Sequence, residues 1–309
     1  MTVSVVLSFL NEEEVLPELI RRLVVVLSKE PEEYELVFIN DSSTDGSSEL
    51  LLQARAENPR IKIVNTSRRF GMVECIIAGL EYATGDAIIY LDTDLQDPPE
   101  VIPEMLAKWR DGADVVYTIR TKRKGENPLK MWLTRQAYRL IGSISDVDLP
   151  VDAGNFRLIT SKMRDQILQL RETEPYLRGL VRWIGFRQEP VYYEREARHA
   201  GECHVPLFGT GPAKEFILGL TSFSTVPIFI ILLVGLFTSA LSFGGLSVIG
   251  LSGIWGGISG QAALIAFMGL LWGILMFSIG FVGIFVVRTY KDVRGRPRYI
   301  IKDTVGFDD

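Results

Sequence analysis

The residues best suited to chemistry are the aspartates of the run D-T-D-L-Q-D-P-P-E at positions 92–100. Alternate side chains of an extended segment point the same way, so Asp92 and Asp94 are expected to present their carboxylates to one face. Two such oxygen ligands attract Mg²⁺ or Mn²⁺, which completes its coordination with water and substrate phosphates. A bare D-x-D pattern is a weak signal, because surface turns are rich in Asp. The run predicts a metal-bound diphosphate, an interpretation that depends on the surrounding sequence.

The elements that must position this run follow from the pattern of the first 120 residues. Short β-branched runs predict five strands, at Val3–Phe9, Glu35–Asn40, Ile61–Asn65, Ala87–Asp92 and Ala113–Thr118. The segments between them predict helices at Glu12–Ser28, Thr44–Glu57, Gly71–Ala83 and Pro99–Arg110. Strands that alternate with helices predict an α/β fold with a mostly parallel sheet. Ligands of such sheets bind beyond the carboxyl ends of the strands, where Asn11, Asp41, Ser67 and residues 92–97 are expected to lie.

The charge and cysteine content exclude several classes of function. Residues 1–215 carry 27 Lys and Arg against 34 Asp and Glu, a net charge of −7. An acidic domain without a basic stripe is a poor binder of nucleic acid. The sequence has neither the glycine fingerprint of dinucleotide-binding folds nor a P-loop, which argues against redox chemistry and NTP hydrolysis. Cys75 and Cys203 suit a reducing compartment, and residues 1–10 are too short for a signal peptide, so the N-terminal domain is expected in the cytoplasm.

A stretch without charged residues or His covers Phe216–Val287 and excludes a wholly soluble protein. Its glycine-rich part, Gly244–Gly260, is interpreted as a turn between two spans, at Ser222–Phe243 and Gln261–Val287. Each span exceeds the ~20 residues that a bilayer core requires. Lys214 precedes the first span and six basic residues follow the second, which predicts that both termini are cytoplasmic. The alternative, a buried hairpin of a soluble protein, is disfavoured by two such long uncharged runs.

Residues 121–215 have a less regular pattern. A basic stretch at Arg120–Lys124 precedes a predicted helix at Pro128–Ile141, on which Trp132, Arg135 and Arg139 share one face. Such a helix could lie on a membrane surface, where anionic headgroups would favour it modestly. It could equally pack against the domain with a solvated basic edge, and the sequence leaves both interpretations open.

Three loop motifs together resemble the nucleotide-sugar-binding GT-A domain of family 2 glycosyltransferases. They are F-L-N-E-E-E at residues 9–14, N-D-S-S-T-D-G-S at residues 40–47 and the D-x-D run. The D-x-D run also resembles the D-A-D-L-Q-x-P-P-E pattern of the polyprenyl-phosphate glycosyltransferases. Further matching runs are S-R-R-F-G at 67–71, A-G-L at 78–80, V-D-A-G-N-F-R-L at 151–158, W-I-G-F at 183–186 and residues 195–202. With its two C-terminal spans, the chain is most similar to the bacterial bactoprenol glucosyltransferase type.

This resemblance implies a GT-A catalytic domain over residues 1–204, a juxtamembrane connection over 205–221, two transmembrane helices over 222–287 and a basic cytoplasmic tail over 288–309. It implies inverting transfer of a hexose, with glucose favoured, from a UDP-sugar to undecaprenyl or another polyprenyl phosphate. The lipid phosphate oxygen would attack C1 in line while UDP leaves under stabilisation by Mg²⁺ or Mn²⁺. Close helix contact, and with it a homo-oligomer, is expected from the glycines of the second span: Gly269, Gly273, Gly280 and Gly283.

The site residues implied by the resemblance fall into three groups. The donor is expected to contact Asn11, Glu13, Asp41 and Asp92, and the metal to be held by Asp92 and Asp94. The expected catalytic residues are Asp94, Asn155 and Arg198, the last because it matches the family arginine before G-E-S. Two anionic substrates repel each other in one cleft, so the acceptor phosphate also needs cations. The candidates for this role are Arg120, Arg123, Arg195 and His204.

Two positions depart from the family pattern. Asn155 stands where D-x-G-D-F-R is common, and His204 replaces the usual phosphate-facing lysine of G-E-S-K-Y. The acceptor is a phosphate monoester with a second pKa near ~6, so it is mostly a dianion at neutral pH and hardly requires a general base. Asn155 can still position the acceptor or the sugar through hydrogen bonds, so turnover is expected to be reduced rather than absent.

Two other functions remain as alternatives. A processive polysaccharide synthase would carry Q-x-x-R-W near residue 180, but Gly179 stands three positions before Arg182, and two spans are too few for a polymer channel. A membrane-anchored binding or scaffold protein with a decayed catalytic domain is supported by the two departures above. The retained pair of D-x-D aspartates argues against that scaffold.

Overall fold

The computed structural model describes residues 1–123, 153–196, 218–219, 221–224, 226–253 and 260–307. Within them, eight strands form one sheet: β1 (Thr2–Phe9), β2 (Glu33–Asn40), β3 (Ile61–Thr66), β4 (Ala87–Asp92), β5 (Val115–Arg123), β6 (Ala153–Thr160), β7 (Gln188–Arg195) and β8 (Ile301–Val305). Their order across the sheet is β7-β5-β6-β4-β1-β2-β3-β8. The predicted helix at Pro128–Ile141 lies outside the described residues.

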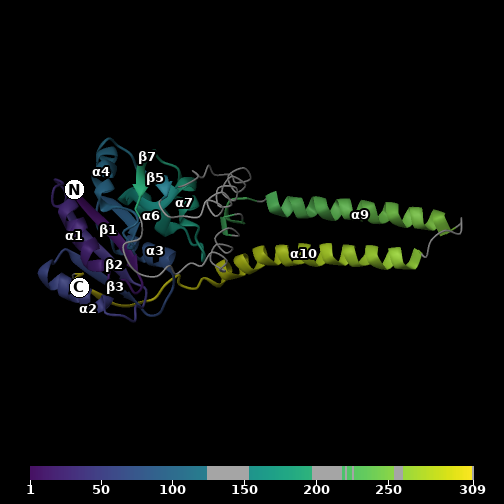
Figure 1. Cartoon of the computed structure of the whole chain (residues 1–309), viewed down its shortest axis with the longest axis horizontal. Coiled ribbons are helices and arrows are strands. Elements are labelled where there is room, and N and C mark those ends of the chain that lie inside the picture. The colour runs from purple at the N-terminus through teal and green to yellow at the C-terminus, as the bar shows by residue number, and fades with distance from the viewer. Residues whose placement is uncertain (124–152, 197–217, 220, 225, 254–259, 308–309) are drawn as a thin grey trace.

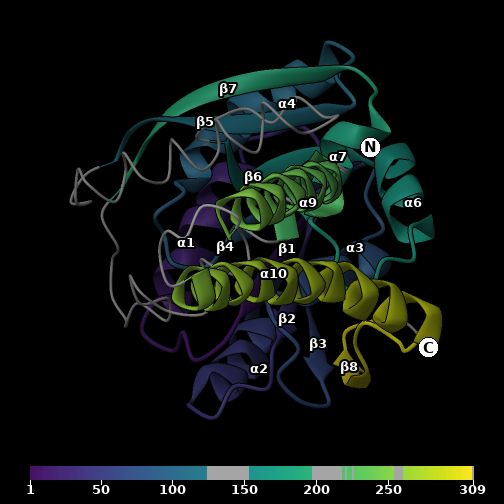
Figure 2. The same cartoon turned by 90° about the vertical axis from the view of Figure 1, so that its right-hand side faces the viewer.

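The centre of the sheet is parallel. β1 pairs in the same direction with β2 and with β4, and β2 pairs likewise with β3. β6 runs antiparallel between β4 and β5, and β7 is parallel to β5. Viewed along the long helices, β5 and β7 lie at one end of the sheet and β3 and β8 at the other (Figure 2). The predicted α/β class with a mostly parallel sheet is therefore confirmed.

Helices cover both faces of this sheet. One face is covered by α1 (Leu16–Leu27), α2 (Ser47–Glu57) and α4 (Ile102–Arg110), and α4 follows a 3₁₀ turn at Pro99–Val101. These helices form one buried cluster with the side chains that β1 and β2 direct to that face. α3 (Met72–Tyr82), α6 (Ser161–Gln169) and α7 (Leu177–Ile184) pack on the opposite face. Since both faces are covered, β1 and β2 are buried almost without interruption rather than at alternate residues. This double core fixes the strand ends from which the site is built.

Two long apolar helices, α9 (Val226–Gly253) and α10 (Gly260–Arg294), project side by side from the domain (Figure 1). Their segments Val226–Gly245 and Phe267–Arg294 are long and apolar enough to cross a membrane. Apolar side chains cover their surface, and Leu233 of α9, for example, is 65% exposed. An exposed apolar surface of this size fits membrane association and disfavours the buried soluble hairpin.

The boundaries of these helices differ from the prediction. α9 continues through Gly244 to Gly253, so the expected turn at Gly244–Gly260 is shorter, and residues 254–259 lie outside the described part of the chain. Glycine weakens a helix in water, but in apolar surroundings every backbone N–H and C=O needs a partner, which favours continuing the helix. α10 runs past Val287 to Arg294, where basic residues complement the helix dipole.

The C-terminal segment was expected to be only a basic tail, but it contributes β8 to the sheet. β8 pairs antiparallel with the edge strand β3. Beyond it, the Phe307 ring packs edge-on against Tyr82 of α3, with ring centroids 5.0 Å apart. The chain before α9 and the chain after α10 therefore belong to the same domain, and the N- and C-termini both lie at the domain end of the molecule (Figure 1).

Candidate active site

Just beyond the carboxyl ends of three strands, at one edge of the sheet, one residue in each loop adopts the left-handed backbone conformation. Asn11, Ser42 and Leu95 have φ values of 56°, 64° and 56°, and they follow β1, β2 and β4. This conformation costs a residue other than glycine of order 1–2 kcal/mol and persists where surrounding contacts impose it. Leu95 is held there by its side chain, which is only 1% exposed. The carboxyl ends of β1, β2 and β4 thus carry sharply turned loops at a common edge.

The loops after β1 and β2 are hydrogen-bonded to each other. Asn11 Oδ1 accepts from the Thr44 N–H at 2.8 Å, and the Asn11 N–H donates to Ser43 Oγ at 3.0 Å. Glu13 Oε2 accepts from the Gly46 N–H at 2.9 Å, just before α2. Asn11 and Glu13 therefore hold the two loops together at the predicted edge, and their contact with a donor stays a prediction.

Asp41 is a buried carboxylate beyond the end of β2. Its Oδ1 accepts from the Phe70 N–H at 2.7 Å and its Oδ2 from the Gly71 N–H at 3.0 Å. Gly71 has a φ of 117°, a conformation that favours glycine and lets this turn present two N–H groups to one carboxylate. Burial, and then the negative charge of Asp41, raise the pKa of the Cys75 thiol, which makes this cysteine unreactive. Asp41 thus fixes the start of α3 at the predicted edge.

Asp92 and Asp94 lie at the end of β4 and just beyond it. Asp92 Oδ1 is buried and has no hydrogen-bond partner among the described residues. Burial, followed by the negative charges of Asp97 and Asp94, raises the pKa of Asp92 to about 6. Asp94 Oδ1 accepts from the Gln96 N–H at 3.1 Å, which orients this carboxylate within the turn.

These two carboxylates suit a divalent cation. A buried carboxylate oxygen without a donor is unfavourable unless a cation or a proton neutralises it. Across the parts of the chain that the structure describes, no three His, Cys, Asp or Glu side chains form a complete metal cage. Asp92 and Asp94 therefore fit a cation such as Mg²⁺ or Mn²⁺, which keeps water and substrate oxygens in its other positions.

Asp97, the third aspartate of the run, has a different environment. It is fully buried and accepts hydrogen bonds from Arg120 Nη2 at 3.2 and 3.3 Å and from the Tyr193 hydroxyl. Arg195 Nε lies 3.7 Å from Asp97 Oδ1. Burial acts to lower the pKa of Arg120, but the charges of Asp97 and Tyr193 outweigh it and raise the pKa. Arg120 and Arg195 thus converge on a buried acid that the sequence analysis did not assign, and their contact with an acceptor phosphate stays a prediction.

Asn155 lies on β6, the neighbour of β4 on the side away from β1. Its Oδ1 accepts from Arg178 Nε at 2.7 Å, and its Nδ2 faces Met72 Sδ at 3.9 Å. Arg178 also acts on Asp92, whose pKa its positive charge lowers against the larger effect of burial. Arg178 was not among the predicted site residues, and in the sequence it is marked only by its place in the run Y-L-R-G-L before W-I-G-F.

The remaining predicted residues are not fully placed. Arg198 and His204 lie outside the described residues. For Arg123 only the backbone is described, and it pairs with Arg195 in the register of β5 and β7. A catalytic role for Arg198 and phosphate contacts for Arg123 and His204 therefore stay predictions.

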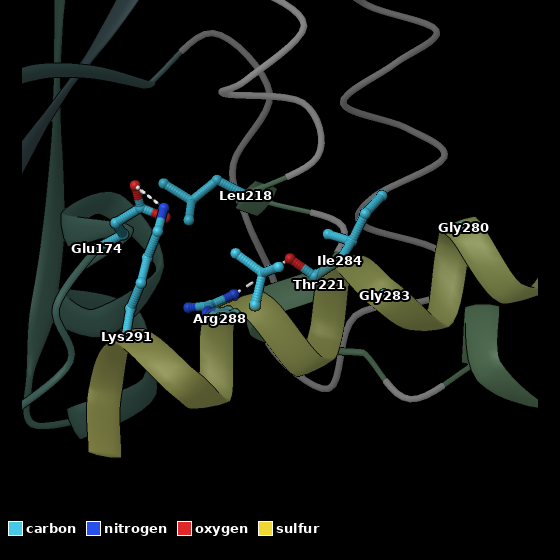
Figure 3. Close-up of a pocket in the computed structure, with 9 residues that line it drawn as sticks. Glu174, Leu218, Thr221, Gly280, Gly283, Ile284, Arg288 and Lys291 are labelled. Atoms are coloured by element: carbon cyan, nitrogen blue, oxygen red, sulfur yellow. Dashed lines mark hydrogen bonds and ion pairs between the residues drawn. The ribbon is translucent and has the colours of Figure 1, made fainter. Parts of the chain in front are cut away.

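The domain meets the long helices through the segment that precedes α7. Glu172 and Glu174 pair with Arg288 and Lys291 of α10, with N···O distances of 3.4 and 2.9 Å. A cavity of about 460 Å³ lies beside these ion pairs and is bounded by Glu174, the two basic residues and the apolar turns of α10 (Figure 3). None of the predicted site residues lines this cavity.

Comparison with known proteins agrees with this architecture. Residues 4–168 match the family model described as Glycosyl transferase family 2. The chain is 39% identical over 308 residues to the uncharacterized glycosyltransferase YkcC of Bacillus subtilis, covering 99% of this chain and 95% of that protein. It is 33% identical over 305 residues to the bactoprenol glucosyl transferase of Shigella phage SfII, covering 98% of both.

Solved structures of lower similarity include glucosyl-3-phosphoglycerate synthase from Mycobacterium tuberculosis, which is 20% identical with a TM-score of 0.49 and coverage of 72% of this chain and 79% of that one. Membership rests instead on the family model, which spans more than half of the chain, and on the relatives that align over almost its full length. On these grounds, the protein belongs to glycosyl transferase family 2.

Proposed function

We propose that the protein transfers a hexose, with glucose favoured, from a UDP-sugar to a polyprenyl phosphate such as undecaprenyl phosphate, with inversion at the anomeric carbon. The observation that carries this proposal is Asp92 Oδ1, which is buried and lacks a hydrogen-bond partner among the described residues, near Asp94 at the edge of a family 2 domain attached to two long apolar helices. Similarity over 98% of the chain to a bactoprenol glucosyl transferase supports glucose as the transferred sugar and a polyprenyl lipid as the acceptor.

The donor is proposed to lie across the carboxyl ends of β1, β2 and β4. Its nucleoside would face Asn11, Glu13 and Asp41, and its diphosphate would face Asp92 and Asp94, in agreement with the general position of ligands in parallel α/β sheets. A bound Mg²⁺ or Mn²⁺ would supply charge stabilisation for the departing diphosphate. The chain contributes by holding both carboxylates at one point, while the ion pair with Arg120 keeps Asp97 from adding a third uncompensated charge.

The acceptor is proposed to be the nucleophile without the help of a strong base. A phosphate monoester is largely a dianion at neutral pH, so an unprotonated oxygen is available to attack. That oxygen forms a bond to C1 of the sugar while the bond from C1 to the UDP oxygen breaks, and the electron pair leaves with UDP. No proton has to be removed from the acceptor, so an asparagine at position 155 is compatible with turnover.

The helices are proposed to anchor the domain to the cytoplasmic face of a membrane. Since β1 and β8 belong to one sheet, the two spans must begin and end on the same side of the bilayer. The basic residues that follow the second span favour the cytoplasm for that side. Confinement to the membrane surface raises the effective concentration of an insoluble lipid acceptor. A homo-oligomer formed through the glycines of α10 stays a prediction.

The test is to incubate the purified protein with radiolabelled UDP-glucose, or with other labelled UDP-sugars, and undecaprenyl phosphate. We expect label in an organic-extractable lipid, most rapidly from UDP-glucose, and loss of that label when both Asp92 and Asp94 are replaced by Ala. Label found only in long water-soluble chains would instead support the processive synthase. Nucleotide binding without any labelled product would support the decayed scaffold.

A further inference from the structure

Arg178 is fixed in place by two neighbouring elements. It is the second residue of α7, and its backbone carbonyl accepts from Arg157 Nη1 of β6 at 3.2 Å. Its side chain donates from Nε to Asn155 Oδ1 at 2.7 Å, again on β6. Held at both its backbone and its side chain, the guanidinium has a defined position against the strand next to β4.

Asn155 and its partner Arg178 lie on the side of β4 away from the strands of the proposed donor site. In the sheet order β6-β4-β1-β2, Asp92 ends β4, the donor loops follow β1 and β2, and Asn155 with Arg178 lies on the β6 side. In the antiparallel pairing of β4 with β6, Tyr90 lies opposite Arg157, which brings Asn155, two residues earlier on β6, beside Asp92, two residues later on β4. The positively charged Arg178, on the other side of the proposed metal ligands from the nucleotide, is better placed to bind the lipid phosphate than the nucleotide sugar.

The same helix is the part of the domain packed against the membrane-proximal chain. Phe223, three residues before α9, contacts Gly179, where any Cβ would collide with the phenylalanine ring. The Tyr176 and Phe223 rings lie 6.3 Å apart, centroid to centroid. Just before α7, the Thr173 N–H donates to Asp292 of α10 at 2.8 Å. α7 and the segment before it thus contact the chain at the base of the two apolar helices, and Arg178 of α7 contacts the strand beside β4, so the proposed route of a lipid acceptor passes this helix.

We propose, on the basis of the function proposed above, that Arg178 binds the phosphate of the lipid acceptor and that Asn155 positions Arg178 for this contact. An arginine has five N–H donors in a planar fork that matches phosphate oxygens, and the bond from Nε to Asn155 orients that fork. The side chain at position 155 then has to supply an oxygen that accepts a hydrogen bond from Arg178, and it does not have to act as a general base. Asparagine supplies that oxygen without a negative charge, and aspartate would supply the same oxygen.

The experiment measures initial rates against polyprenyl phosphate and UDP-glucose separately, for the full-length protein in detergent. Arg178→Gln is expected to raise the KM for the acceptor by about 10- to 100-fold, the loss typical of a hydrogen bond between charged groups, and to change the donor KM less than threefold. Arg178→Lys keeps the charge without the fork and should fall between Arg178→Gln and the unchanged protein. The matched control is Arg182→Gln on the same helix, whose arginine donates to Gln188 and should leave both KM values unchanged.

Asn155 is tested by rescue and by coupling. Asn155→Ala should raise the acceptor KM in the same direction as Arg178→Gln, whereas Asn155→Asp should stay within about threefold of the unchanged protein. Adding Asn155→Ala to Arg178→Gln should cause no further loss, because the first residue acts through the second. Thermal unfolding of each variant separates these effects from misfolding. A change confined to the donor KM, or full additivity of the two substitutions, would overturn the assignment.

The outcome also separates this inference from the proposed function. If the unchanged protein makes no labelled lipid, the proposed function fails, and Arg178 is then tested by titrating the protein with polyprenyl phosphate. Binding at least tenfold tighter by the unchanged protein than by Arg178→Gln supports the phosphate contact, and equal binding overturns it. If the unchanged protein is active but Arg178→Gln keeps the normal acceptor KM, only the inference fails.

Discussion

Replacing Asp92 by Asn is expected to stabilise the folded protein while it abolishes transfer. Burial and two neighbouring acids raise the pKa of Asp92 from 3.8 to about 6, so the folded state holds this charge at a cost. That rise corresponds to about 3 kcal/mol at 1.36 kcal/mol for a tenfold change in acidity. The cost is absent well below pH 3.8, where Asp92 is protonated in both states, grows as the pH rises from 3.8 to about 6, and is fully present above that. Asparagine has the same shape and no charge, so the gain in unfolding free energy should appear only at the higher pH.

The assay is thermal unfolding of the purified protein in detergent with EDTA, at pH 8 and at pH 4.5. For a domain of 150–250 residues, 1 kcal/mol moves Tm by roughly 2–4 °C, so Asp92→Asn should raise Tm by about 6 °C or more at pH 8 and by much less at pH 4.5. Asp94→Asn is the control: its Oδ1 can still accept from Gln96, and since the Asp94 charge raises the pKa of Asp92 less than burial does, the gain should be smaller. An equal gain at both pH values, or a lower Tm at pH 8, would refute the reasoning.

The other predictions concern the metal, the buried ion pair and the C-terminal strand. EDTA should abolish lipid labelling and Mg²⁺ or Mn²⁺ should restore it, and calorimetric titration should show metal affinity falling about tenfold per pH unit below pH 6, as Asp92 takes up a proton. Asp97→Asn should lower the unfolding free energy by about 3–5 kcal/mol, since it leaves the Arg120 charge buried without its partner; an unchanged denaturation midpoint would contradict this. Deleting residues 300–309 should lower Tm and promote aggregation measurable by light scattering, because it exposes the edge of β3; a monodisperse protein of unchanged Tm would show that β8 is dispensable.

Much of the fold could be predicted from the sequence because burial on both faces leaves a clear pattern. The β-branched runs before Asn11, Asp41 and the D-x-D aspartates become β1, β2 and β4, and their parallel order brings the three loops to one edge. Two features had no such signal. β8 is a short, mostly exposed strand whose pairing with β3 spans more than 200 residues of sequence, and the extension of α9 depends on surroundings that suppress the effect of glycine.

The site was predictable where one strand carries neighbouring residues and less so where distant elements meet. Asp92 and Asp94 are two positions apart, so they remain near each other in space, although Asp94 lies in the turn beyond β4 and not in the extended segment that the sequence pattern predicted. Arg120 was assigned to the acceptor from its charge, but the structure pairs it with Asp97. Spacing could not reveal that pairing, because β5 reaches the D-x-D loop only through the register of the folded sheet. Arg178 was missed for the same reason, since only the packing of α7 on β6 brings it to Asn155.

The three aspartates of the D-x-D run thus have two different environments: Asp97 pairs with Arg120, whereas Asp92 and Asp94 are the proposed metal ligands. If Asp97 were not neutralised by Arg120, its negative charge would act in full on Asp92, whose pKa is already raised by burial, and would raise that pKa further. A higher pKa would leave Asp92 protonated near neutral pH and unable to hold a cation. The buried Asp97–Arg120 ion pair thus limits the rise in the pKa of Asp92, and with it the lower end of the pH range expected for metal binding. Conversely, Asp92 Oδ1 has no hydrogen-bond partner in the described part of the chain, which suits that oxygen to the proposed metal.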